Sequence, residues 1–133
     1  MGIELKDAHG CAISANTFTI NKTSSLTIGP ESGRITVTGN NFSNSYVGKE
    51  KVIRGSSDLE AAGLKLTGTR DITVSGNLFS GLRPKALDTA AASVRRVLFS
   101  DNLLVDTPSD HAQLKDSLVT DNLPEDSTAK PKP

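Results

Sequence analysis

The chain has 133 residues, with 15 Lys plus Arg balanced by 15 Asp plus Glu, so its formal net charge at pH 7 is zero. This balance argues against a nucleic acid or an anionic membrane as the main binding partner. Aromatic residues make up only 4% of the chain, which favours small repeated contributions over the core of a compact globule.

The start of the chain shows no targeting or membrane segment. No apolar run approaches the ~18 residues that span a bilayer. Residues 1–7 lack the basic and apolar parts of a signal peptide, and a strand-like pattern begins already at Gly2. This abrupt start predicts a truncated chain or a piece of a longer solenoid. The single cysteine, Cys11, cannot form an internal disulfide.

Five segments align on a recurring asparagine. Apolar residues stand five and three positions before it in the first four segments, and Phe or Leu stands two positions after it. This alternation predicts a strand, a turn at the asparagine and a second short strand. The segments are Cys11–Phe18, Ile35–Phe42, Ile72–Phe79, Val97–Leu104 and the weaker Ser117–Pro124.

A second strand motif precedes each of these segments. Its copies are Ile3–Leu5, Leu26–Ile28, Leu64–Leu66, Leu87–Thr89 and, less clearly, Leu114–Asp116. The repeat unit is therefore about 24 residues long, with an insertion at 44–62 and a shortened last copy. Such a unit cannot bury its own apolar face, whereas stacked parallel copies can.

The predicted fold is all-β, a right-handed parallel β-helix of about five coils over residues 1–123. Residues 124–133 carry no apolar anchor and predict a disordered tail. Side chains one coil apart should lie over one another in interior columns. The predicted columns are Ile3/Leu26/Leu64/Leu87/Leu114, Cys11/Ile35/Ile72/Val97, Ile13/Val37/Val74/Phe99/Val119 and Phe18/Phe42/Phe79/Leu104.

The pattern Gly-Ile-x-Leu, a turn, and Ile-x-x-Asn-x-Phe resembles the repeat of the pectin lyase-like superfamily of parallel β-helices, over about residues 2–123. The resemblance implies that the Gly-Ile-x-Leu strand belongs to the first of three sheets and that the asparagine marks the turn between the second and third. It also implies an extracellular or cell-surface location. The scaffold carries many unrelated activities, so it does not define a function.

The recurring asparagines are interpreted as a structural ladder rather than as glycan or metal contacts. Asparagine tolerates the left-handed backbone conformation, and its amide can bond both to the turn and to the next asparagine. Stacking explains identical residues at a repeated turn. The ladder residues are Asn16, Asn40, Asn77, Asn102 and Asn122.

The outward position of the first-sheet motif provides the candidate binding residues. It predicts one column of Glu4, Thr27, Lys65, Asp88 and Lys115. Two interpretations stay open: a surface row of ion pairs worth ~0–1 kcal/mol each, or part of a carbohydrate groove, since the first sheet and its loops form the substrate cleft in the lyases and hydrolases that the chain resembles. The candidate substrate-binding residues are Glu4, Lys65, Asp88, Lys115, Tyr46 in the insertion, and Arg83 and Lys85 in the next turn.

Catalysis is left open by the sequence. Asp88 with Lys65 is the one pair that can be placed on the cleft face as a base beside a cation. No metal or cofactor is expected, because neither EF-hand spacing nor a Cys/His set is present. The alternative is Ca²⁺ between Asp101 and Asp121, which should lie one coil apart.

The functional expectation is a carbohydrate-associated β-helix, a fragment or the terminal coils of a secreted polysaccharide-binding or polysaccharide-degrading protein. The alternative is a non-catalytic structural or adhesin-like surface β-helix. The expected partner is a polysaccharide, with no nucleic acid and no membrane span. The unpaired edge around Ile3–Leu5 predicts self-association or coils missing at that end.

Overall fold

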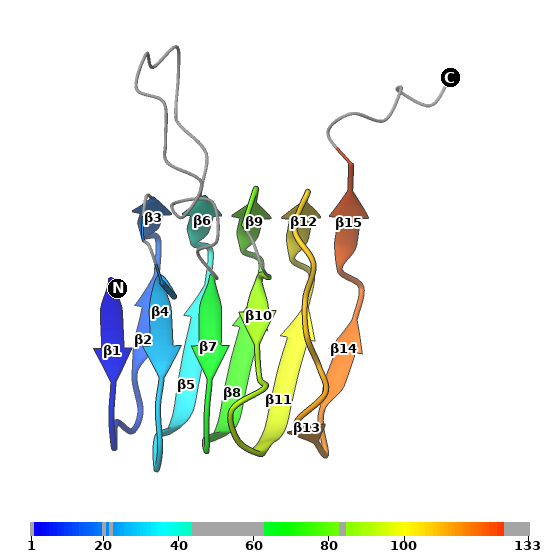
Figure 1. The fold of residues 1–133 in the computed structure, drawn as a ribbon. Coiled ribbons are helices and arrows are strands. Elements are labelled where there is room, and N and C mark those ends of the chain that lie inside the picture. Colours follow the sequence, from blue (N-terminus) through cyan, green and yellow to red (C-terminus); the bar gives the residue numbers. More distant parts are fainter. Residues whose placement is uncertain (1, 20, 22, 44–62, 83–84, 127–133) are drawn as a thin grey trace.

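The computed structural model describes residues 2–19, 21, 23–43, 63–82 and 85–126. These residues form fifteen short strands and no helix, and every strand pairing among them is parallel (Figure 1). Within the same residues there is accordingly no helix that could cross a membrane. Successive strands along the chain join different sheets, and each strand pairs with its counterpart one coil further on, which confirms the predicted parallel β-helix.

Three sheets form the walls of the solenoid. The first contains β1 (Ile3–Leu5), β4 (Leu26–Ile28), β7 (Leu64–Leu66) and β10 (Leu87–Asp88). The second contains β2 (Ala12–Ser14), β5 (Gly33–Thr38), β8 (Arg70–Ser75) and β11 (Val94–Ser100), with β13 (Leu114–Lys115) and β14 (Leu118–Thr120) both paired to β11. The third contains β3 (Thr17–Thr19), β6 (Asn41–Ser43), β9 (Leu78–Ser80), β12 (Leu103–Val105) and β15 (Leu123–Glu125).

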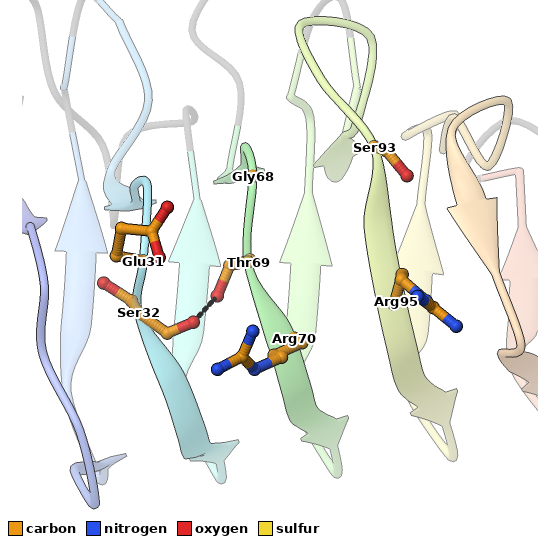
Figure 2. A pocket seen from close by; sticks show the side chains of 7 residues that line it. All are labelled: Glu31, Ser32, Gly68, Thr69, Arg70, Ser93 and Arg95. Carbon is orange, nitrogen blue, oxygen red and sulfur yellow. Dashed lines mark hydrogen bonds between the residues drawn. The ribbon is translucent and has the colours of Figure 1, made fainter.

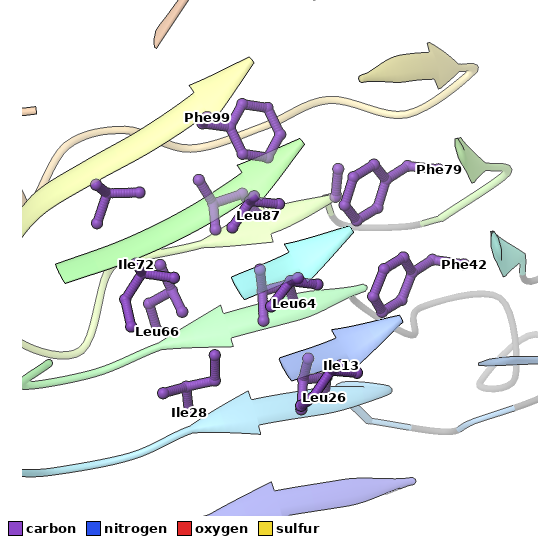
Figure 3. Packing of buried hydrophobic residues seen from close by; sticks show 14 of the residues in the cluster. Ile13, Leu26, Ile28, Phe42, Leu64, Leu66, Ile72, Phe79, Leu87 and Phe99 are labelled. Atoms are coloured by element: carbon purple, nitrogen blue, oxygen red, sulfur yellow. The ribbon is translucent and has the colours of Figure 1, made fainter. Parts of the chain in front are cut away.

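The core lies between the sheets and consists of stacked like residues (Figure 3). The register aligns Leu26 with Leu64 and Leu64 with Leu87, as predicted from the repeat. The rings of Phe18, Phe42 and Phe79 stack with centroids 4.9 and 4.7 Å apart. Each coil therefore covers the apolar side chains of its neighbours, which no single coil could do alone.

The last coil departs from the prediction. Leu114 pairs with Val94 and Lys115 with Arg95, so β13 belongs to the second sheet and its assignment to the first was wrong. Residues 108–110 lie beside β10 instead: the Ala86 N–H donates to the Pro108 carbonyl at 2.6 Å and the Asp110 N–H to the Leu87 carbonyl at 2.9 Å. The short spacing from Leu114 to the last asparagine leaves room only for the second-sheet strand.

The asparagine ladder is present in every coil. The backbone N–H and the side-chain Nδ2 of Asn40 both donate to Oδ1 of Asn77, at 2.9 and 3.1 Å. The same pair of bonds joins Asn16 to Asn40, Asn77 to Asn102, and Asn102 to Asn122. The predicted single file of asparagines is therefore confirmed.

The left-handed residue of this turn is not the asparagine, as the sequence suggested, but the residue before it. These residues are Ala15, Gly39, Gly76, Asp101 and Asp121, with φ between 55° and 65°. The reversal at that residue turns the following side chain into the bend, where Nδ2 of Asn77 reaches the Ser75 carbonyl at 3.1 Å. The amide then satisfies the turn backbone as well as the next coil.

Strand β15 runs to Glu125 and so extends into the segment predicted as a tail. The insertion at 44–62, with Tyr46, lies outside the described residues, as do Arg83 and residues 127–133.

Candidate functional site

Four of the predicted first-sheet residues lie in one row. The register joins Glu4 to Thr27, Thr27 to Lys65 and Lys65 to Asp88. Both carboxylates have local partners: Glu4 forms an ion pair with Lys6 at 3.3 Å, and Oδ1 of Asp88 accepts the Ala90 N–H at 3.1 Å. Asp88 therefore closes the turn that follows β10.

Lys85 lies in the turn that precedes β10 and forms an ion pair with Asp110 at 3.3 Å. The Ala112 N–H and the Lys85 ammonium both stabilise the Asp110 carboxylate, which holds the pKa of Asp110 below its ordinary value. Both side chains are largely buried, so this pair ties the last coil to the fourth. Lys115, which was predicted to complete the first-sheet row, lies on the second sheet.

A different row, on the second sheet, gathers positive charge. The register joins Gly33 to Arg70, Arg70 to Arg95 and Arg95 to Lys115, and all three cationic side chains are exposed. Like charges at paired positions on neighbouring strands repel each other, and a bound anion would relieve that repulsion. We call Arg70, Arg95 and Lys115 the cationic row.

The apolar pattern of the sequence does not predict this row, although the repeat contains a signal for it. Each of the three residues stands seven positions before a ladder asparagine, as do His9 and Gly33 in the first two coils. The residue that follows each row position has an irregular backbone conformation. It interrupts the inward–outward alternation of the strand, so counting back from the interior apolar residues does not identify the row as outward-facing.

That irregular position is left-handed in every coil. Its residues are Gly10, Arg34, Asp71, Arg96 and Asp116, with φ between 49° and 71°. A left-handed non-glycine residue costs roughly 1–2 kcal/mol. The kink interrupts the inward–outward alternation of side chains along the strand. From the second coil to the fifth, the residues at this position alternate between a cation and a carboxylate.

Ion pairs join neighbouring coils at this kink. Nε of Arg96 lies 2.5 Å from Oδ1 of Asp71, and a second guanidinium nitrogen lies 2.9 Å from Oδ2. This bidentate contact, with further attraction from Arg70 and Arg34, lowers the pKa of Asp71. Arg95 binds Asp116 at 2.9 Å. Arg70, by contrast, has no ion pair or side-chain hydrogen bond within the described part of the chain.

The two neighbouring columns form a basic face on a molecule without net charge. Its five cations face two carboxylates, Asp71 and Asp116, which gives a local charge of 5 − 2 = +3. The cations are Arg34, Arg70, Arg95, Arg96 and Lys115. Charge segregation of this kind raises the local concentration of anions.

A cavity of about 210 Å³ opens beside the cationic row (Figure 2). Arg70 and Arg95 border it from neighbouring strands, and Glu31 and Ser93 add a carboxylate and a hydroxyl. Its wall is firm, because the buried Thr69 hydroxyl donates to the carbonyl of buried Ser32. The cavity is smaller than the roughly 300–1,000 Å³ of drug-sized sites and suits one small anionic unit.

Other candidate chemistry lacks essential parts. Within the described ranges, no group of three His, Cys, Asp or Glu side chains could hold a metal ion. Asp101 and Asp121 follow the paired residues Ser100 and Thr120, so they are two adjacent carboxylates, and Ca²⁺ there stays a prediction.

A Ser–His contact in the last coil has a packing role. Nε2 of His111 lies 3.0 Å from the Ser109 hydroxyl, but its Nδ1 is buried with no partner among the described atoms. A catalytic His needs an acceptor there to orient it. The His111 ring packs instead against Phe99, with centroids 5.8 Å apart.

No protein-family model matches the chain, and no curated protein or solved structure matches it either. The class of protein is therefore defined by its own architecture: a three-sheet parallel β-helix with a basic face on its second sheet. Because this kind of scaffold supports unrelated activities, function has to be argued from that face.

Proposed function

We propose that this β-helix binds an acidic polysaccharide across the basic face of its second sheet. The observation that carries the proposal is the cationic row, three exposed cations in register on consecutive coils. Guanidinium groups bind carboxylates and sulfates through two parallel hydrogen bonds. Arg70, which has no partner among the described residues, is the first contact that such a ligand would take.

The geometry favours an extended polymer. Adjacent coils are about 4.8 Å apart, so the row presents repeated charges along the axis of the solenoid. A linear polyanion lying along this axis can contact all three cations at once, and each contact releases counterions. The basic face and the cavity contain no aromatic side chain on which a nucleic-acid base could stack.

The resemblance to the pectin lyase-like superfamily supports a polysaccharide as the class of polyanion, and with it a secreted or cell-surface location. Binding without turnover is proposed, because the carboxylates of the first-sheet row already have local partners. If the protein also cleaves the polysaccharide, Asp88 would be the base and Lys65 the neighbouring cation, both on the first sheet.

The test is titration calorimetry of the whole chain with a polyuronate, a sulfated glycan and a neutral glucan. The acidic polymers are expected to bind, more weakly as salt rises from about 50 to 200 mM, and the neutral glucan not to bind. Arg70→Gln and Arg95→Gln should each weaken binding about tenfold, the equivalent of about 1.4 kcal/mol.

Lys65→Gln is the matched control, since it removes one positive charge from the first sheet and leaves the basic face intact. If Lys65→Gln abolishes binding while Arg70→Gln does not, the site lies in the first-sheet row. The absence of binding to every polymer refutes the proposal and favours the structural alternative. Release of unsaturated products or new reducing ends would show turnover, which Asp88→Ala should then remove.

The structural alternative is a surface β-helix that serves as a rigid spacer. The unbroken asparagine ladder favours it, because hydrogen bonds join all five coils without a gap.

A further inference from the structure

We propose that the chain stacks head to tail, the last coil of one copy binding the first coil of the next. The two ends of the solenoid differ because all sheets are parallel. The outer strands are β1, β2 and β3 at one end and β13, β14 and β15 at the other, where β10 is the last strand of the first sheet (Figure 1). Outer strands carry unpaired backbone groups, and here both ends run in the same direction, so a second copy can continue the same pairing.

The ladder has a polarity that matches this arrangement. In each asparagine–asparagine bond of the ladder, the asparagine of the earlier coil donates and Oδ1 of the later one accepts. Within the described residues, Oδ1 of Asn16 therefore accepts no hydrogen bond, and the backbone N–H of Asn122 donates none. At the ladder position the first coil therefore offers an acceptor and the last coil a donor, which complement each other when two copies stack head to tail.

The interior columns point to the same partner. Val119 continues the column of Ile13, Val37, Val74 and Phe99, whose members are at most 8% exposed. Val119 itself is 39% exposed, because the described residues place no coil beyond it. Continued register would cover Val119 with Ile13 of the next copy. Leu118, the neighbour of Val119 on β14, alternates to the outside and stays outside the contact.

Pro124 limits the strength of the contact. The Leu123 N–H donates to Asn102 and the Glu125 carbonyl accepts from Asp106, so both residues face the fourth coil. Pro124, between them, faces away from the fourth coil, toward the outer edge of the third sheet. Proline has no backbone N–H, so it cannot donate a hydrogen bond to a second copy there. The third sheet therefore adds one bond fewer than it could, and stacking should be reversible and concentration-dependent.

The register also supplies a chemical probe of this contact. The row of Cys11, Ile35, Ile72 and Val97 ends at Ser117, whose hydroxyl accepts the Val97 N–H at 2.9 Å. Stacking would bring Cys11 of one copy about 4.8 Å from position 117 of another, inside the roughly 4.4–6.8 Å that a disulfide spans. Within one chain the two positions are four coils, about 19 Å, apart and cannot be bridged.

The decisive experiment is oxidation of the Ser117→Cys chain with oxidised glutathione, followed by non-reducing electrophoresis. Stacking predicts covalent dimers, trimers and higher species, because a head-to-tail contact does not close on itself. Ser93→Cys is the control, since position 93 is more exposed than position 117 but lies out of register with Cys11. Cross-linking of Ser117→Cys no faster than that of Ser93→Cys would overturn the proposal.

Sedimentation equilibrium of chains without an added cysteine tests the same contact. Wild type should associate in an open series as its concentration rises, and Pro124→Thr should associate more strongly. Val119→Lys should remain monomeric because it places a charge in the contact, whereas Leu118→Lys should behave as wild type. Circular dichroism confirms that each variant is folded. A wild-type chain that stays monomeric, or that stops at a closed dimer, contradicts head-to-tail stacking.

Discussion

The position before each ladder asparagine is left-handed whatever side chain stands there. Gly76 has φ +64°, and an added Cβ would meet nothing within 4 Å, so Gly76→Ala tests the backbone alone. We expect it to lower the free energy of unfolding by about 1–2 kcal/mol. Ala15, with φ 57°, already has a Cβ in the left-handed conformation. Ala15→Gly should therefore raise the free energy of unfolding by about 1 kcal/mol in urea titrations.

Ala12→Gly is the control, because Ala12 lies in the regular part of β2 and glycine there should destabilise by about 0.5–1 kcal/mol. Equal effects of the glycine substitutions at positions 12 and 15 would contradict the backbone explanation.

His111 predicts a pH dependence of stability. Burial lowers its pKa, and the nearby Asp110 carboxylate opposes this only in part. The unfolded chain therefore binds the proton more readily than the folded chain, so protonation favours unfolding. The contribution of His111 is fully present above the unfolded pKa of about 6.5 and is lost as pH falls from there through the lower pKa of the folded chain.

The free energy of unfolding should accordingly decrease between about pH 7.5 and 5.5, above the range where carboxylates titrate. The measurement is urea unfolding at several pH values. His111→Gln should flatten this dependence, because it removes the buried imidazole whose pKa is lowered. A dependence that survives His111→Gln would assign it to another group.

Among the repeated elements, the ladder turn joins several buried polar groups through one asparagine side chain. Asn77 donates to the Val37 and Ser75 carbonyls and to Asn102, and its Oδ1 accepts both donors of Asn40. Asn77→Ala leaves several buried groups without partners, each at a cost of about 1–3 kcal/mol. We expect a loss of at least about 3 kcal/mol in thermal or urea unfolding.

Asn16→Ala makes the same change at the exposed end of the ladder, where the lost side chain donates only to Oδ1 of Asn40 and to the Ser14 carbonyl. Its cost should be closer to 1 kcal/mol. Similar losses at the two positions would mean that ladder bonds contribute little beyond the local turn.

At the scale of the whole molecule, each coil contacts only its neighbours, so stability should vary along the axis. The inward side chains of β5 and β8 are at most 1% exposed, whereas Leu118, Val119 and Leu123 of the last coil are 39–58% exposed. Amide hydrogen exchange should therefore be slowest in β5 and β8 and fastest in β14 and β15. Uniform protection across all coils would show that the solenoid unfolds as one cooperative unit.

Much of the architecture was predictable because it repeats. Alternating apolar residues and the recurring asparagine identified the strands, the ladder and the interior columns up to the fourth coil. The prediction was wrong for Leu114 and Lys115, where local pattern could not distinguish a first-sheet strand from a second-sheet strand. The hydrogen bonds of residues 108–110 to the fourth coil decided that assignment.

The cationic row shows the same limit. Arg70, Arg95 and Lys115 are far apart along the chain, and they align only because a left-handed residue resets the strand in every coil. The first-sheet row was correctly aligned for Glu4, Lys65 and Asp88. The two carboxylates nevertheless bind groups close by in the chain, Glu4 to Lys6 and Asp88 to the Ala90 N–H, and not one another's neighbours in the row.

The sequence alone determined the repeat, and with it a parallel β-helix, because short strands with apolar alternation repeated about every 24 residues bury their apolar side chains by stacking coil on coil. That Arg70, Arg95 and Lys115 share one face of the second sheet became evident only in the tertiary structure. That outcome depends on the length of each turn and on the sign of φ at single residues, which side-chain periodicity does not encode.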